Sequence, residues 1–97
     1  MNRLTDIADS FTQVDRGGFP VWVHKTAPVW ICHYEAIEDS QSFRHEFYQP
    51  YVPVEKLKPG RAVWAHNNKR VGKEGAFRTL EAAMQAAVEA VAQKEAA

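Results

Sequence analysis

The sequence has little cysteine and no long apolar run, and both shortages exclude classes of protein. Its single cysteine, Cys32, cannot form a disulfide within the chain, so we expect a fold without disulfides in a reducing, cytoplasmic setting. No stretch approaches the roughly 18 apolar residues that a membrane-spanning helix needs. Residues 1–6 also lack the apolar run of a secretory signal. The sequence therefore predicts a cytoplasmic protein that has no contact with a membrane.

Net charge is also absent, because 12 basic and 12 acidic side chains cancel. This balance argues against a strongly basic nucleic-acid binder and against an acidic mimic of DNA. The charges are nevertheless unevenly placed along the chain. Residues 1–53 balance to −3, residues 54–80 to +5 and residues 81–97 to −2. The chain is neutral but polarised, with its excess positive charge in one segment.

Hydrophobic residues make up 45% of the 97 positions and aromatic residues 11%, which is enough to form a real core. A chain of this length is expected to form one domain, spanning residues 1–97. Such a small domain leaves little room for both a core and an enclosed active site. Composition thus favours a binding protein over an enzyme.

Two strands are predicted at residues 19–25 and 29–37, where β-branched and aromatic residues are frequent. The paired glycines at positions 17 and 18 predict a turn before the first of them. Alternation divides the side chains between two faces. The first strand places Trp22 and His24 opposite Val21 and Val23, and the second places Trp30, Cys32 and Tyr34 opposite Val29, Ile31 and His33. Both faces of the sheet are therefore expected to be substantially apolar.

The segments around these strands give weaker patterns. Residues 2–14 suit a short helix, although residues 11–14 also suit a strand, and residues 38–42 are a polar loop. Residues 43–48 suit a third strand or a helical turn, and the strand is favoured. Prolines at 50, 53 and 59 predict an ordered loop over residues 49–60. Residues 61–66 then predict a strand, residues 67–68 a turn and residues 69–71 a short returning strand.

The C-terminal segment gives the clearest pattern. Thr79 is a good N-cap, and Glu81 in the first turn complements the helix dipole. An apolar stripe at helical spacing follows, formed by Leu80, Met84, Ala87, Val88 and Val91. The predicted fold class is α+β: a small antiparallel sheet of three to five strands, with this amphipathic helix packed on one face and a short N-terminal helix.

No constellation in the sequence predicts catalysis, a cofactor or a metal. The residues of ligand type lack metal-site spacing, and they are His24, Cys32, His33, His45 and His66. Cys32 lies within an apolar strand, where an inert thiol is usual. The glycines at 72 and 75 do not match a phosphate-binding loop. We therefore expect no catalytic residue, no cofactor and no metal site.

Two binding hypotheses remain. The first is a small accessory protein that binds another protein or itself as a homodimer, through aromatics that one helix cannot cover. The interface residues of this hypothesis are Trp22, Trp30, Tyr34, Phe47 and Tyr48. The small size and the alanine-rich C-terminal segment would suit a phage or mobile-element protein.

The alternative is a nucleic-acid-binding module that uses a basic hairpin over residues 61–73. Basic side chains neutralise phosphates, asparagines pair with base edges, and a two-stranded ribbon fits the major groove. The residues of this hypothesis are Arg61, Trp64, His66, Asn67, Asn68, Lys69, Arg70 and Lys73.

Overall fold

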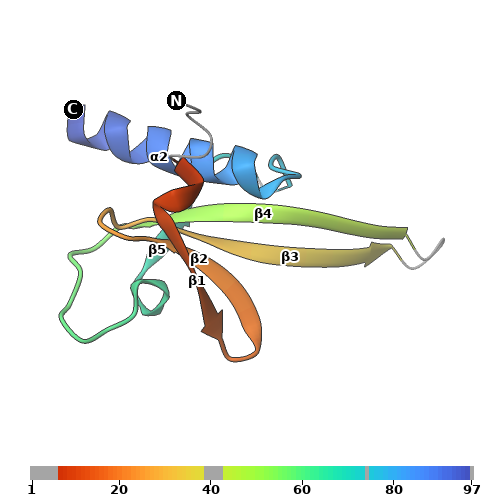
Figure 1. The fold of residues 1–97 in the computed structure, drawn as a ribbon, viewed down its shortest axis with the longest axis horizontal. Coiled ribbons are helices and arrows are strands. Elements are labelled where there is room, and N and C mark those ends of the chain that lie inside the picture. Colours follow the sequence, from red (N-terminus) through yellow and green to blue (C-terminus); the bar gives the residue numbers. More distant parts are fainter. Residues whose placement is uncertain (1–6, 39–42, 74, 97) are drawn as a thin grey trace.

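A computed structural model describes residues 7–38, 43–73 and 75–96 of the chain. Five antiparallel strands form one sheet in chain order, and the C-terminal helix α2 lies across one face of it (Figure 1). The elements are β1 (Phe11–Arg16), β2 (Phe19–His24), β3 (Trp30–Glu38), β4 (Phe43–Pro53), the 3-10 turn η1 (Val63–Ala65), β5 (Asn68–Arg70) and α2 (Leu80–Ala96). The predicted α+β class is confirmed, and the sheet has the upper number of predicted strands.

The N-terminal alternatives are both partly realised, because residues 7–9 are helical and β1 begins at Phe11. The predicted turn at Gly17 and Gly18 is confirmed. Both glycines have positive φ, at 58° and 96°, and the Gly18 N–H donates to Asp15 Oδ1 at 2.9 Å. The start of the predicted helix, at residues 2–6, and residues 39–42 of the predicted polar loop lie outside the described residues.

Strand β4 shows that the loop predicted over residues 49–60 is wrong up to Pro53. The N–H and C=O of one strand residue point to the same side. The Pro50 carbonyl accepts the Val71 N–H at 2.9 Å, so the side of Pro50 that lacks an N–H faces the chain just beyond β5. The N atom of Pro53 faces the β3 side of β4. Strand β3 begins at Trp30, opposite Tyr51, so it does not reach Pro53. At Pro50 the Gln49 side-chain amide donates to Val71 O at 3.1 Å in place of the missing N–H, and at Pro53 the ladder with β3 has already ended.

The strand predicted at residues 61–66 is wrong, and so is the hairpin over 61–73 that depends on it. Residues Val63–Ala65 form η1, and β5 pairs with β4 instead. His66 holds this loop from inside: its Nδ1–H donates to Ala62 O and its Nε2 accepts the Lys58 N–H, each at 2.9 Å. These bonds within the loop replace those of a ladder. The turn predicted at 67–68 is also wrong, because Asn68 already begins β5.

Helix α2 begins as predicted. The Ala82 N–H donates to the Thr79 hydroxyl at 3.2 Å, which satisfies one of the free donors of the first turn. Of the predicted stripe, Met84 and Ala87 are buried, and Ala83 is fully buried beside them. Small side chains at these contacts let the helix lie close to the sheet, where it packs mainly on β4 and β3.

The sheet carries apolar clusters on both faces, as the alternation predicts. The helix face includes Phe11, Val29, Ile31 and Val52, with Trp22 and Tyr48 packed against them. The opposite face, called the open face below, includes Val21, Trp30 and Cys32, and the loop after β4 covers part of it with Val63 and Trp64. Figure 1 shows this loop on the side of the sheet away from α2.

Candidate functional site

Within the described residues, part of strand β3 has no strand paired with it on its β2 side. Strand β3 pairs with β4 along its whole length, from Trp30 to Glu38. It pairs with β2 only from Trp30 to Cys32. The next residue of β2 is Pro20, which has no N–H to continue the ladder opposite His33. Beyond this point the β1–β2 hairpin turns away from the β3–β4 ribbon (Figure 1).

The backbone groups exposed by this divergence can be identified from the hydrogen bonds. The His24 N–H donates to Val29 O at 3.1 Å, so Val29 and every second residue after it point toward β2. The backbone N–H and C=O groups of His33, Glu35 and Ile37 therefore face the side of β3 where β2 lies. The Val21–Cys32 pair places the His33 N–H against the carbonyl of Pro20, whereas the His33 carbonyl has no N–H of Pro20 opposite it, and the Cys32 Sγ lies 3.9 Å from that carbonyl. Beyond this pair, the edge of β3 at Glu35 and Ile37 has no described strand beside it and is open for pairing.

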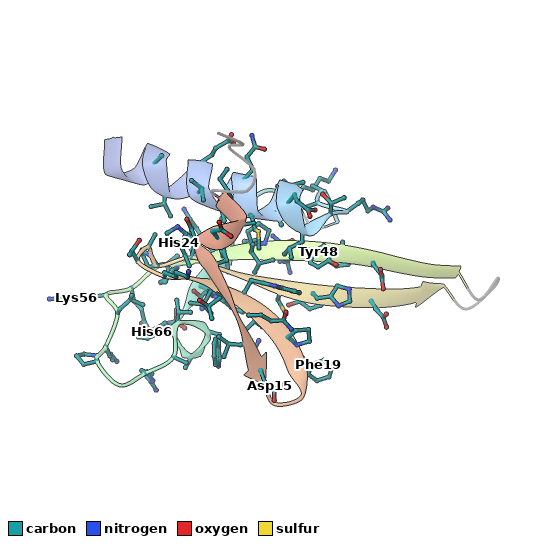
Figure 2. The ribbon with its side chains drawn as sticks, in the orientation of Figure 1. Asp15, Phe19, His24, Tyr48, Lys56 and His66 are labelled. Carbon is teal, nitrogen blue, oxygen red and sulfur yellow. The ribbon has the colours of Figure 1, made fainter. Side chains whose placement is uncertain are left out.

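A groove of about 770 Å³ lies beside this edge, and we call it the β3 groove. Its lining comprises Arg16, Gly17, Phe19, Cys32, His33, Tyr34 and Glu35. Phe19 is 69% exposed and Tyr34 38% exposed, so both rings present apolar surface at the groove. Figure 2 shows Phe19 near the tip of the β1–β2 hairpin, far from α2. The groove thus combines open backbone groups with exposed aromatic rings.

An aromatic ladder on the open face fixes the shape of the groove wall. The Tyr34 ring stacks on Phe47 with centroids 5.3 Å apart, and its hydroxyl lies 2.8 Å from that of Tyr51. Tyr51 stacks in turn on Trp30, at 4.7 Å. Partial burial raises the pKa of the Tyr34 hydroxyl, and the hydrogen bond with Tyr51 raises it further. Tyr34 is therefore a neutral, firmly held ring at neutral pH.

Charge at the groove is balanced between its two walls. Arg16 lies over the Trp30 ring, with its guanidinium carbon 5.5 Å from the centroid, and Glu35 lies on the exposed part of β3. A guanidinium over an indole ring is held by cation–π attraction. The groove lining therefore includes one basic and one acidic residue, and because Glu35 alternates with Tyr34 their side chains lie on opposite faces of β3, which would orient a bound segment.

The structure divides the predicted protein-interface residues between the two faces. Trp22 and Tyr48 lie on the helix face, with ring centroids 5.7 Å apart, and pack against the core under α2. Trp30, Tyr34 and Phe47 lie on the open face, where Trp30 is only 4% exposed. Of the five predicted residues, Tyr34 alone lines the β3 groove.

The predicted nucleic-acid residues are not brought together on a hairpin. His66 is buried in its loop, the Asn68 amide donates to His66 O, and Asn67 binds the Glu55 carboxylate. Trp64 packs edge-on against Trp30, with centroids 6.5 Å apart. The exposed remainder of the set is Arg61, Lys69, Arg70 and Lys73. No three potential metal ligands gather anywhere in residues 7–38, 43–73 and 75–96.

Sequence reasoning missed Arg16, Phe19 and Glu35 as members of a site, and it missed the open edge itself. One indication was present in the chain. Pro20 directly follows Phe19 and lies opposite His33 when β2 pairs with β3. Because proline has no N–H to donate, the β2–β3 ladder ends there. That indication needs the register of β2 against β3, which the sequence alone does not fix.

His24 holds the turn between β2 and β3, and its titration gives a testable pH dependence. Its Nδ1 accepts the N–H groups of Ala27 at 2.9 Å and Thr26 at 3.2 Å, and burial lowers its pKa from 6.5. The unfolded chain therefore binds the proton more readily than the folded chain, so stability falls as the pH drops through 6.5.

His24→Asn should reduce this loss, because an asparagine carbonyl can accept the same turn N–H groups but does not titrate. Urea denaturation of both proteins at about pH 7.5 and about pH 5.5 measures the difference. We expect the wild type to lose more stability than the variant between these two values. An equal loss in the two proteins would mean that His24 titrates normally in the fold.

None of the helices in the described ranges is both long and apolar enough to cross a membrane. Comparison with known proteins finds no match to this chain among family models, curated proteins or solved structures. We therefore infer its function from the geometry of its own surface.

Proposed function

We propose that this protein is a small, non-enzymatic binding module that accepts an extended segment of another protein as an added strand on β3. The observation that supports it most is the open backbone edge of β3 at Glu35 and Ile37, which continues from the β3 groove. An unpaired strand edge is the ordinary template for strand addition. The lone, buried Cys32 fits a cytoplasmic setting for this activity.

The two parts of the site have separate tasks in this mode of binding. Backbone groups of β3 would supply affinity for any extended segment, whatever its sequence. Every second side chain of that segment would then enter the groove between Phe19 and Tyr34, which favours apolar or aromatic residues there. Arg16 and Glu35 would select the charges on either side. Specificity therefore resides in the groove and affinity largely in the edge.

Nucleic-acid binding is the weaker alternative. The hairpin on which it depends is not formed, and His66, Asn67 and Asn68 are engaged in holding their own loop. What supports it is the exposure of Lys69, Arg70 and Lys73. Exposed basic side chains are shared by many proteins that bind no nucleic acid, so we rank this function second.

The test is a selection of random displayed peptides, about 12 residues long, on the full chain, followed by amide exchange measured by NMR. We expect a class of peptides that slows exchange at the Glu35 and Ile37 amides. The Tyr34 amide faces β4, where Tyr34 and Phe47 are paired, so it should be slow already in the free protein. This alternating pattern is specific to a strand added at that edge.

Phe19→Ser should weaken the binding of these peptides about tenfold or more, because it removes an exposed aromatic anchor. Val54→Ser is the matched control, since Val54 is an exposed apolar residue, at 58%, outside the β3 groove. Its affinity should stay within about twofold of wild type. Strand addition is ruled out if no selected peptide protects the two amides, or if Phe19→Ser binds as tightly as wild type.

A further inference from the structure

A second groove shares no lining residue with the β3 groove and has a different chemistry. It occupies about 650 Å³ where the end of β4, strand β5 and the C-terminal half of α2 meet. Its apolar lining includes Val52, Val54, Val71 and Ala90, and its basic lining is Lys69 and Arg70. We call it the β5 groove.

The apolar part of the β5 groove is open to solvent rather than closed over by the fold. Val54 is 58% exposed, and Leu57, a few residues further along the same loop, is 43% exposed. Helix α2 packs mainly on β4 and β3, and Ala90 is the one residue of its C-terminal half in the groove lining. Exposed valine and leucine side chains beside a groove favour an occupant with apolar side chains of its own.

The charge around the β5 groove is strongly one-sided. Between Val54 and Lys73 the chain has six basic side chains, all exposed, which are Lys56, Lys58, Arg61, Lys69, Arg70 and Lys73. Glu55 is the one acidic residue of this segment, and it already accepts two hydrogen bonds from Asn67. Figure 2 shows Lys56 extending outward from this loop, while His66 lies within it. Of the six basic residues, Lys69 and Arg70 line the groove and no acidic residue does, so the field there is positive and attracts an anionic partner.

We infer that the β5 groove binds an acidic amphipathic segment of a partner protein. The acidic side chains of that segment would face Lys69 and Arg70, and its apolar side chains would cover Val54 and the accessible part of Val71. A nucleic acid would use the positive charge but would leave the exposed Val54 without a partner. The pairing of basic and apolar lining in one groove thus favours a protein segment over a polynucleotide.

The test begins with peptides that are selected on the wild-type chain and still bind the Phe19→Ser variant, which separates this groove from the β3 groove. We expect these peptides to be rich in both acidic and large apolar residues. Lys69→Glu should weaken their binding about tenfold. Arg78→Glu is the control, because Arg78 is exposed just before α2 begins at Leu80, and Leu80 lies about 15 Å along the helix from Ala90.

Two further measurements decide between the occupants. The affinity of a selected peptide should fall as NaCl rises from about 50 to about 300 mM, whereas Val54→Ser should weaken it at both concentrations. The inference is overturned if the surviving peptides show no acidic enrichment or if Lys69→Glu binds them normally. It is also overturned if polyglutamate or a short DNA duplex binds as tightly as they do, since that defines a general polyanion surface. None of these outcomes bears on strand addition at β3, which Phe19→Ser tests separately.

Discussion

Trp30→Ala should lower the free energy of unfolding by about 3–5 kcal/mol, because Trp30 is the central buried ring of the open face. It is 4% exposed, stacks on Tyr51, meets Trp64 edge-on and lies under the Arg16 guanidinium. Removing it leaves a cavity beneath the loop after β4. Since a domain of this kind has about 5–15 kcal/mol of total stability, the variant should be close to unfolding.

Trp30→Phe is the informative comparison. The Trp30 indole N–H is buried without an acceptor among the described residues, and a buried donor without a partner costs free energy. Phenylalanine removes that donor while keeping a ring in the stack, so its loss should stay below about 2 kcal/mol. Urea denaturation followed by far-UV circular dichroism measures both variants. A loss below about 1 kcal/mol for Trp30→Ala would show that the open face has no real core.

Ile31→Ala should cost about 2–5 kcal/mol, although its side chain points to the other face of the sheet. Ile31 is fully buried in the cluster that joins β3 to Ala83, Met84 and Ala87 of α2. Truncating it removes apolar contacts and leaves a cavity, because the helix rests on small side chains and cannot easily move closer. The same denaturation experiment gives its value.

Val54→Ala controls for general effects of truncating an aliphatic side chain, since Val54 is largely exposed and should change stability by no more than about 0.5 kcal/mol. Truncating either of the adjacent residues Trp30 and Ile31 should thus strongly destabilise the protein, although their side chains lie on opposite faces of the sheet. If Ile31→Ala were as mild as Val54→Ala, α2 would not pack on β3 as described.

The two proposed sites together describe an adaptor. The β3 groove would hold an extended apolar segment, and the β5 groove an acidic amphipathic one. Because the two grooves share no residue, both segments could be bound at once. A single protein could supply both segments, or two different proteins could be brought together.

Much of the fold could be predicted because the relevant patterns are local. Alternation in residues 19–25 and 29–37 correctly placed Trp22 and Ile31 on opposite faces from Val21 and Trp30. Thr79 and the apolar stripe after it correctly placed α2, since capping and helical spacing depend on neighbours in the chain. The low strand propensity of proline wrongly predicted a loop at Pro50 and Pro53. Strand β4 includes both, because of the direction in which each missing N–H faces relative to β3 and β5.

The candidate sites could be predicted only in part. Tyr34, which the sequence predicts as a partner contact, lines the β3 groove, but Arg16 and Phe19 join it only because the β1–β2 hairpin turns away after Val21. The basic residues of the 61–73 segment were correctly noted as a charged group, but their assignment to a hairpin was wrong. His66 turns inward to bind Ala62 O and the Lys58 N–H, and this removes it from any surface ribbon.

The sequence by itself determined the elements whose reasons lie within a few residues: the Gly17–Gly18 turn, the alternation of β2 and β3, and the capped helix α2. Only the tertiary structure decided where a strand edge stays open and which side chains meet across a groove. Those features depend on register and on which segments lie side by side, because a proline at position 20 matters only once His33 lies opposite it. Local chemistry fixed the strands and the helix, and long-range packing decided which of their surfaces remain available to a partner.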